Sequence, residues 1–594
     1  MKVFLLHRDQ DFAVKRGLSD GIFHAMASGD LFAVTNARRN LEREREKNAS
    51  LFAAAPGSDD ALTQDLELET LWNAMAAGDE FLFETAKRAV LSSLSDPEAI
   101  SYRQHVLADC LERPEAVRQL YELALEALEN ERTVGAFWSG ASPDRILSRS
   151  VQVLTLHVDV LKRLRQIAEE QGEHFRSEGF TRFFAMLREE LSNDYLQTVE
   201  HHLRELQFKR GVLESAELAK GLKARNHIVR RQREQSWKER LPFGDRPPSY
   251  SFDIHPRDEA GFKALEEIRG KGINLVANAV AQSADHVKSF FSMLRLELAF
   301  YLGCLNLRES LDEKGEPTCF PTPLGAGQLA LAAEAIYDVC LTLHLDDRAI
   351  ANDVNADGKS LVMITGANQG GKSTLLRSLG LAQLMMQSGM FVGAQSFRAD
   401  VCAGVFTHYK REEDDAMESG KLDEELARMS VIADRIRPNS ILLCNESFAS
   451  TNEREGSEIA RQVVRALLAK QIKVFFVTHM YDLSHRFHAQ GLDTALFLRA
   501  ERQPGGRRTF KLVEGEPLST SYGEDSYRRI FGASVGVDQV RDNHDEEHVE
   551  KVEVDVAGLD RPDAIGDPLD RSHQRRVQEP LEDGHDPESV VHRP

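Results

Sequence analysis

The chain has 594 residues, of which 42% are hydrophobic and 28% are charged, and its formal net charge is −21. This length is too great for one hydrophobic core, so several domains are expected, and the composition is typical of a globular protein. The negative charge argues against a protein that coats nucleic acid over its whole surface, but it leaves room for a local basic groove.

The start of the chain and the cysteines indicate the compartment. The apolar run in MKVFLLHRDQDF is too short for the hydrophobic part of a signal peptide, and no apolar run approaches the roughly 18–20 residues that span a bilayer. The six cysteines are scattered without a CxxC pair, which is typical of reduced thiols rather than of disulfides or a zinc site. We therefore expect a cytoplasmic protein with no membrane partner.

The first part of the chain is predicted to be mostly helical. Residues 1–60 form an N-terminal segment with a charged helical run, and AAAPGSDD near its end is typical of a linker. Over residues 65–345, apolar residues recur at steps of three and four, which predicts a helical core domain. Asp96 and Pro97 are expected to end one of its helices.

Residues 222–250 form the most basic segment of this core and end in a Pro-rich loop. Clustered arginine and lysine side chains can bind DNA phosphates without reading the sequence. A solvated helix face, with its charges balanced by Glu234 and Glu239, carries the same residues without any DNA, so both interpretations stay open. The candidates for DNA contact are Arg230, Arg231, Arg233 and Lys238.

Beyond about residue 345 the pattern changes, because short apolar strands such as SLVMIT, SILLCNE and KVFFVTH alternate with helical stretches. This alternation predicts βαβ units and a parallel sheet covered on both faces, which gives an α/β domain over residues 346–535. ALFLRAER and RRTFKLVEGE flank residues 503–506 and predict a hairpin. Residues 541–594 contain sixteen Asp and Glu against seven Lys and Arg, and we expect this acidic tail to be disordered.

GANQGGKST lies between a predicted buried strand and a predicted helix, and it fits the pattern G-x-x-x-x-G-K-[ST] without a gap. The glycines let the backbone wrap around phosphate oxygens, and the N–H groups that open the helix face the negative charge. Lys372 is expected to reach the β- and γ-phosphates of ATP, and Ser373 is expected to bind Mg²⁺. The predicted nucleotide-binding residues are Gly366, Ala367, Asn368, Gln369, Gly370, Gly371, Lys372, Ser373 and Thr374.

The strand SILLCNE ends in Asn445 and Glu446. A carboxylate at this position can orient the attacking water or accept its proton, so Glu446 joins Lys372 as a residue assigned to catalysis. Asn445 stands where an aspartate is expected, and its amide can reach a metal-bound water but brings no negative charge. We expect both residues to contact Mg²⁺ through water, with weaker metal retention and slower hydrolysis because of Asn445.

His479 ends the next strand, VFFVTH. In an open parallel sheet, a side chain at the carboxyl end of a strand points into the ligand crevice. His479 is therefore the third residue assigned to catalysis, in contact with the γ-phosphate or with the attacking water.

Together these stretches resemble the MutS family, the DNA mismatch-repair ATPases of the ABC class of P-loop proteins. TGANQGGKST is similar to the family's TGPNMGGKST, NESFASTN occupies the place of DE-x-GRGTS, and VTHMYDL matches ATH-x-x-EL. The stretch 519–532 is similar to the SYG-containing helix that follows, and Asn352 and Asp353 occupy the place of an element at the nucleotide's edge. The resemblance covers residues 65–535 and is most specific over 336–535.

The resemblance implies a multidomain chain, with a mostly α-helical core followed by an α/β P-loop ATPase domain. It also implies a homodimer in which each ATP lies between the phosphate loop of one subunit and the signature loop of the other. Helical levers then convert closure around ATP into movement around DNA. The chain is expected to lack the family's mismatch-reading domain, and the long helical arms and DNA clamp are expected to be truncated or absent.

The signature region, residues 415–426, is another departure because it is shorter than in the family. Leu422 and Glu425 fit its F-x-x-E element, and Ser419 is the candidate for its phosphate-contacting serine.

We therefore expect a MutS-like ATPase that couples ATP binding and hydrolysis to DNA binding, in mismatch repair or a related repair or recombination process. It is expected to lack a mismatch reader of its own. The alternative is an ATP-switched interaction protein with no direct role on DNA, which the acidic charge favours. The recombination-suppressing branch of the family, which carries a small C-terminal nuclease domain, is least favoured because the tail shows no such domain.

Overall fold

A computed structural model of the chain describes the residues on which the account below rests: 1–8, 60–136, 142–209, 211–221, 224–231, 250–367, 369–411, 420–503 and 508–518. The acidic tail, the stretch 519–532 and most of the N-terminal segment lie outside these residues. The predictions made for them are therefore neither confirmed nor contradicted.

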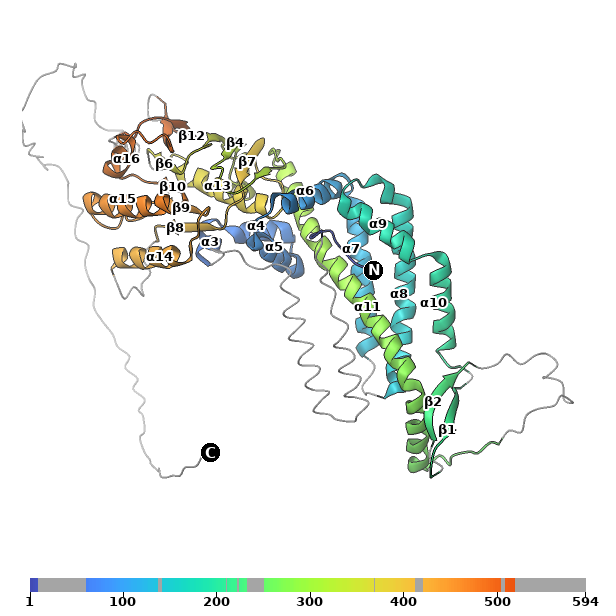
Figure 1. Cartoon of the computed structure of the whole chain (residues 1–594). Coiled ribbons are helices and arrows are strands. Elements are labelled where there is room, and N and C mark those ends of the chain that lie inside the picture. The colour runs from blue at the N-terminus through green and yellow to red at the C-terminus, as the bar shows by residue number, and fades with distance from the viewer. Residues whose placement is uncertain are drawn as a thin grey trace, which may run out of the picture. The chain divides into compact units, whose positions relative to one another are not determined.

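The first half of the described chain is mostly helical, as predicted (Figure 1). The helix before Asp96 and Pro97 ends at Ser92, as expected, and Asp96 also has a second role. Its side chain accepts a hydrogen bond from the Glu98 N–H and caps the next helix, with Pro97 at the first helical position. The helices are α3 (Asp60–Asp65), α4 (Leu68–Ala76), α5 (Glu80–Ser92), α6 (Pro97–Glu112), α7 (Pro114–Ala136), α8 (Pro143–Gln171), η1 (Gly172–His174), α9 (Glu178–Glu190), α10 (Asn193–Glu205) and α11 (Glu259–Glu313).

Helix α11 shows that a long helical arm is present, and its truncation relative to the family stays a prediction. It runs for 55 residues, a length of about 80 Å at the usual helical rise, and it packs along α7 and α8. By length and composition α11 could also cross a membrane, but 72% of its most apolar window is buried inside the protein. Such burial is typical of a core helix.

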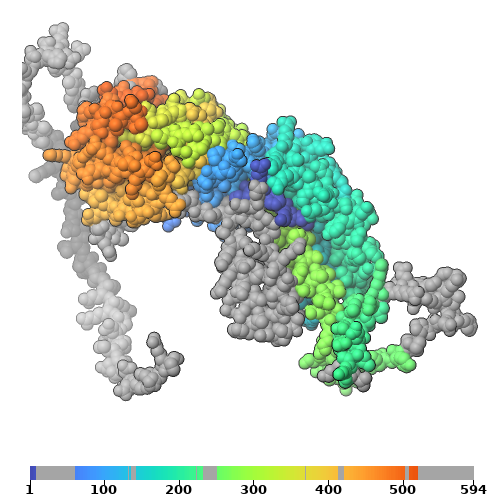
Figure 2. Space-filling view, in the orientation of Figure 1, coloured from blue at the N-terminus to red at the C-terminus, as the bar shows by residue number. Residues whose placement is uncertain are grey.

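A hairpin interrupts the region that was predicted to be helical. Strands β1 (Leu213–Leu218) and β2 (Ala224–Arg230) pair antiparallel. Figures 1 and 2 show them beside the first turns of α11, where Gly272 lies close to the side chain of Glu214. The start of the basic segment is therefore strand rather than helix.

A six-stranded sheet follows within the described residues, in the order β12, β11, β6, β10, β9 and β8. The pairings are parallel except that of β11 with β12, so the predictions of a parallel sheet and of a terminal hairpin are confirmed. The strands are β6 (Leu361–Thr365), β8 (Val405–Tyr409), β9 (Ile441–Asn445), β10 (Lys473–Val477), β11 (Ala495–Arg502) and β12 (Arg508–Glu514).

Helices cover both faces of this sheet, and the alternation of side chains along β6 shows how. Val362 and Ile364 belong to the large apolar core that includes α13 (Lys372–Gln387). Leu361 and Met363 face the other way, into the core that includes α15 (Glu453–Ala469). The remaining helices of this part are α12 (Val339–His344), α14 (Lys421–Arg435) and α16 (Tyr481–His488).

A second sheet contains strands from both predicted domains, because two of its strands precede residue 345 and two follow residue 346. It has the order β3 (Thr322–Leu324), β7 (Ser396–Asp400), β4 (Leu331–Ile336) and β5 (Asn352–Asn355). Strand structure thus begins before the predicted boundary, which itself stays a prediction.

The first residues of the chain are held by a buried polar network. The backbone N–H groups of Leu5 and Leu6 both donate to Glu297 Oε2 on α11, at 2.6 and 2.9 Å. Arg103 on α6 donates through Nε to the Leu6 carbonyl at 2.9 Å and through Nη1 to the Ser388 carbonyl at 3.3 Å, just past the end of α13. The start of the chain therefore links α6 and α11 to the helix that follows the phosphate loop.

Candidate nucleotide site

The predicted phosphate loop joins the fully buried strand β6 to α13. Gly366 and Gly371 have φ angles of 113° and 87°, in the left-handed region that favours glycine. A Cβ atom on Gly366 would lie 2.8 Å from the Ala500 nitrogen, and one on Gly371 would lie 2.9 Å from the Phe510 carbonyl oxygen. The glycines are therefore needed both for the turn and for the close approach of the hairpin β11–β12.

Lys372 is buried at the start of α13, and its Nζ donates to the carbonyl oxygens of Gly366 at 2.8 Å and Ala367 at 3.0 Å. Burial lowers the pKa of this ammonium, Glu446 opposes that effect, and Arg508 adds to it. Asn368 lies outside the described residues.

The other predicted loop residues are placed as follows. Gln369 accepts a hydrogen bond from Arg508 Nη1 at 2.6 Å. Gly370 lies against Ala500. Thr374 lies in the first turn of α13, where its carbonyl accepts from Ser378 Oγ at 2.7 Å.

The structure brings the end of β9 to the start of α13, as the motif spacing predicted. Ser373 Oγ donates to Asn445 Oδ1 at 2.9 Å. The Asn445 carbonyl accepts from the Lys410 N–H at 2.9 Å, which extends the β8–β9 ladder by one bond. Two neutral oxygens, one hydroxyl and one amide, therefore lie side by side where a metal is expected.

Glu446 and His479 also meet at this edge of the sheet. The Nδ1 atom of His479 lies 3.4 Å from Glu446 Oε2. The hydrogen bond from His479 lowers the pKa of Glu446 against the effect of burial, and the charges of Lys372 and Lys410 lower it further. Glu446 is therefore held as a carboxylate beside the loop.

His408, a buried histidine that was not predicted from the sequence, joins the segment that follows Glu446 to helix α14. His408 on β8 contacts Ser447 Oγ at 2.7 Å through Nδ1 and the Glu425 carbonyl at 3.0 Å through Nε2. Burial lowers its pKa to about 4, so the ring is neutral at physiological pH. A signal was present in the sequence, because VFTHY carries a histidine near a strand end much as VFFVTH does.

The helix α14 carries part of the predicted signature element. Glu425 is buried, and its Oε1 accepts from Ser450 Oγ at 2.9 Å. Leu422 packs against the apolar core that includes α15. Ser419 lies outside the described residues.

Asn352 and Asp353, which the resemblance placed at the nucleotide's edge, hold neighbouring strands. Asn352 is buried, donates through Nδ2 to the Phe510 carbonyl at 3.2 Å and accepts from the Leu512 N–H at 2.7 Å. Asp353 accepts from the Ala335 N–H at 2.7 Å. Asn352 therefore fixes the hairpin β11–β12 where it touches the phosphate loop, whereas Asp353 holds β4.

The described DNA-contact candidates lie on the other hairpin, β1–β2, and not at the phosphate loop. Arg230 Nε donates to Ser215 Oγ at 2.8 Å. Arg231 pairs with Glu205, with 2.8 Å between Nη2 and Oε1. Arg233 and Lys238 lie outside the described residues.

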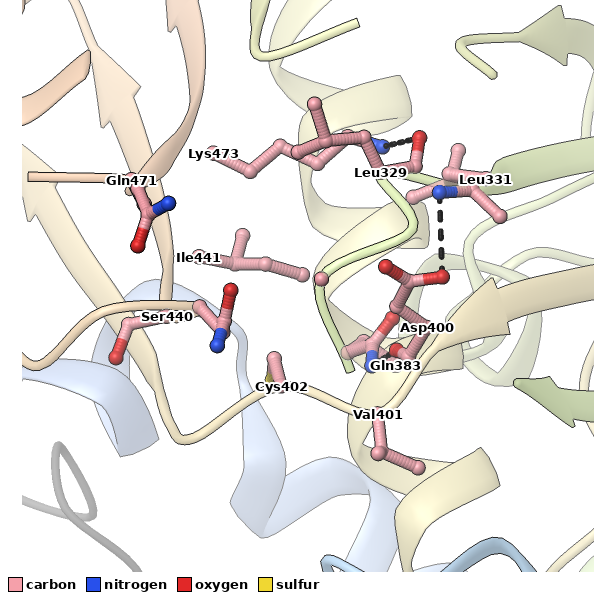
Figure 3. Close-up of a pocket in the computed structure, with 13 residues that line it drawn as sticks. Leu329, Leu331, Gln383, Asp400, Val401, Cys402, Ser440, Ile441, Gln471 and Lys473 are labelled. Carbon is pink, nitrogen blue, oxygen red and sulfur yellow. Dashed lines mark hydrogen bonds between the residues drawn. The ribbon is translucent and has the colours of Figure 1, made fainter. Parts of the chain in front are cut away.

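A small cavity opens at the opposite edge of the six-stranded sheet, where β9 and β10 begin (Figure 3). Its volume of about 30 Å³ is room for one or two water molecules and not for a nucleotide. Lys473 lines it and donates to the Leu329 carbonyl at 3.1 Å. This cavity is therefore distinct from the phosphate loop.

Two family models match separate parts of the chain. Residues 95–314 match the model of the MutS2 N-terminal domain, and residues 362–531 match the model of MutS domain V. The first match covers much of the helical part, and the second covers the phosphate loop, Asn445, Glu446 and His479.

Individual relatives match over shorter stretches. The chain is 27% identical to MutS protein homolog 4 of Mus musculus over 263 residues, which are 43% of this chain and 25% of that protein. It is 29% identical to endonuclease MutS2 of Streptococcus pneumoniae over 174 residues, 28% of this chain and 22% of that protein. It is 31% identical to the DNA mismatch repair protein MutS of Thermus aquaticus over 176 residues, 29% of this chain and 21% of that protein.

These matches span a quarter or less of the length of each relative. The agreement of two domain models over separate parts of the chain nevertheless identifies the family, as the motifs indicated. The chain belongs to the MutS family.

Proposed function

We propose that the chain is an ATPase that couples ATP binding and hydrolysis to DNA binding, in mismatch repair or a related repair or recombination process. The observation that carries the proposal is the hydrogen bond from Ser373 Oγ to Asn445 Oδ1 at 2.9 Å. This bond joins the start of the loop helix to the end of a neighbouring parallel strand, beside the pair formed by Glu446 and His479. Ligands of open α/β sheets bind at this carboxyl edge.

The residues present fit ATP and Mg²⁺. The glycine turn leaves backbone N–H groups at the start of α13 to meet phosphate oxygens, and Lys372 exchanges its contacts with the loop carbonyls for phosphate contacts. Ser373 Oγ and Asn445 Oδ1 are hard oxygen donors of the kind that Mg²⁺ prefers, directly or through water. The metal would supply positive charge to the β- and γ-phosphates.

Glu446 and His479 are the residues that we assign to the attacking water. The lowered pKa keeps Glu446 ionised, so it can orient that water and accept its proton. His479 lies within 3.4 Å of the carboxylate and holds it in place. Because Asn445 is neutral, we expect slow hydrolysis and weak metal retention.

We further propose a cytoplasmic homodimer in which α14 and the signature region before it complete the ATP site of the partner subunit. DNA binding would be directed at the backbone, with Arg230 and Arg231 on the hairpin β1–β2 as part of the surface. The names of the relatives support a role on DNA, since one is a DNA mismatch repair protein and another an endonuclease. The match to the MutS2 N-terminal domain also favours the recombination-suppressing branch of the family, which the sequence alone favoured least.

An ATP-switched interaction protein is the second candidate. The net charge of −21 and the pairing of Arg231 with Glu205 favour it, because both reduce the positive charge available to phosphates. In this case ATP binding would open and close a dimer that recruits a protein, with no contact to DNA.

The two candidates are separated by measuring nucleotide and DNA binding of the full chain at low and high salt. ATPase rates are measured with homoduplex, mismatched, branched and single-stranded DNA. We expect ATP binding, DNA affinity that falls steeply with salt, and stimulation by at least one DNA. ATP binding without any DNA binding at low salt selects the interaction protein, and no ATP binding contradicts both.

A further inference from the structure

The hairpin β11–β12 lies directly against the phosphate loop. Besides its contacts with Gly366 and Gly371, it places Ala500 where a Cβ atom on Gly370 would come within 2.7 Å of its methyl carbon. Asn352 bonds to the backbone of Phe510 and Leu512 in β12 and fixes the position of that strand. Any side chain on the loop-facing side of the hairpin is therefore held next to the phosphate loop.

Arg508, the first residue of β12, is such a side chain. Its Nη1 donates to the side-chain oxygen of Gln369 at 2.6 Å. Gln369 occupies the left-handed region with a φ angle of 57°, which is unusual for a residue other than glycine, asparagine or aspartate. The guanidinium thus reaches the middle of the phosphate loop from a strand more than a hundred residues away in sequence.

Arg508 also places a second cation near Lys372. Burial is the main cause that lowers the pKa of the Lys372 ammonium, and the charge of Arg508 adds to it. The contact with the neutral amide of Gln369 needs only a hydrogen-bond donor and makes no use of the positive charge of Arg508. A planar guanidinium can in addition bind phosphate oxygens through paired, charge-assisted hydrogen bonds.

We propose that Arg508 is a phosphate-binding residue of the nucleotide site, delivered by the hairpin and not by the loop motif. The inference rests on the proposed binding of ATP and assigns a further residue to that site. On nucleotide binding, the guanidinium exchanges the side-chain oxygen of Gln369 for oxygens of the phosphate chain. The contact between the hairpin and the phosphate loop then depends on whether the site holds a nucleotide.

The test compares Arg508→Gln, Arg508→Lys and the control Lys511→Gln in the full chain, by titration with a fluorescent ATP analogue at several salt concentrations. Arg508→Gln keeps a donor for Gln369 but removes the charge, so we expect about tenfold weaker binding. We expect Arg508→Lys to recover part of the affinity. Lys511 lies on the same strand but donates to the Ala351 carbonyl, so its variant should bind like the original chain.

A second readout distinguishes a phosphate contact from a structural role. Inorganic tripolyphosphate should raise the melting temperature of the original chain and of Lys511→Gln, and raise it less in Arg508→Gln. Equal nucleotide affinity and equal tripolyphosphate stabilisation in Arg508→Gln and Lys511→Gln would overturn the proposal.

The remaining outcomes are also decisive. If Arg508→Gln does not fold, the decision rests on Arg508→Lys. Weaker nucleotide binding and smaller tripolyphosphate stabilisation in a folded Arg508→Lys support a guanidinium–phosphate contact, and binding and stabilisation equal to those of Lys511→Gln contradict it. Failure of the original chain to bind the analogue would instead refute the proposed function.

Discussion

At the residue scale, Asn445 puts an amide beside Ser373 where an aspartate would bring a negative charge. Asn445→Asp restores that charge and keeps an oxygen to accept from Ser373. We expect the Mg²⁺ concentration for half-maximal ATP hydrolysis to fall by about tenfold, because the full charge attracts the cation. The measurement is a Mg²⁺ titration of the hydrolysis rate, with Asn445→Ala as the control. Unchanged Mg²⁺ dependence and unchanged turnover in Asn445→Asp would show that the amide does not limit the site.

Glu446 gives a second prediction at this scale. Glu446→Gln should slow hydrolysis by about 10²- to 10⁴-fold while ATP binding stays near that of the original chain. Because the hydrogen bond from His479 lowers the pKa of Glu446, the carboxylate should stay ionised as the pH falls from 8 to 6. The contribution of this carboxylate to the hydrolysis rate should be lost only when the pH falls below the ordinary pKa of glutamate. A rate that tracks protonation of Glu446 between pH 6 and 8 would contradict this assignment.

The residues of the site differ in how far the sequence could predict them. Lys372, Ser373, Asn445 and Glu446 follow strands of a parallel sheet, and the ends of such strands meet at one edge, so their grouping could be predicted. Arg508 could not be predicted in the same way, because its position depends on the pairing of β12 with β11 and on the hydrogen bonds of Asn352.

At the element scale, periodicity predicted most helices but missed the hairpin β1–β2. The stretch LESAELAKGLKARNHIVR contains good helix formers, and its strands form because they pair with each other beside α11. The same limit applies to Asp96 and Pro97, because this pair of residues is compatible both with the end of one helix and with the start of the next. Only the capping bond to the Glu98 N–H decides that a helix begins there.

The buried contacts of the first residues of the chain give the prediction at this scale. Burial raises the pKa of Glu297 to about 7, although the N–H groups of Leu6 and Leu5 and the charge of Arg103 oppose that shift. A raised carboxyl pKa means that the folded state holds the proton more tightly than the unfolded chain. The stability contributed by Glu297 is therefore fully present below its ordinary pKa and is lost as the pH rises through about 7.

The measurement is thermal unfolding of the full chain and of Glu297→Gln from pH 5 to pH 8.5. Relative to the variant, the original chain should lose about 2 °C or more in melting temperature over this range. The comparison cancels the titration of the other groups in the chain. Parallel curves for the two proteins would show that Glu297 does not titrate in this way.

At the scale of the whole molecule, the hairpin β1–β2 is the proposed contact with DNA. Changing Arg230 and Arg231 together to Gln should weaken DNA binding and reduce the slope of log affinity against log salt by about two. The matched control changes Arg163, which pairs with Glu126 on the surface of the helical part, with 2.6 Å between Nη1 and Oε1. If the double variant and Arg163→Gln keep the same slope as the original chain, DNA contacts lie elsewhere.

The central claim is that ATP turnover at the loop is coupled to DNA, and the ATPase rate of the full chain tests it most directly. The rate is measured with Mg²⁺, with and without the panel of homoduplex, mismatched, branched and single-stranded DNA, and Lys372→Ala serves as the inactive control. We predict a slow, Mg²⁺-dependent rate that at least one DNA increases and that Lys372→Ala abolishes. A rate that no DNA changes, or one that survives in Lys372→Ala, would contradict the account.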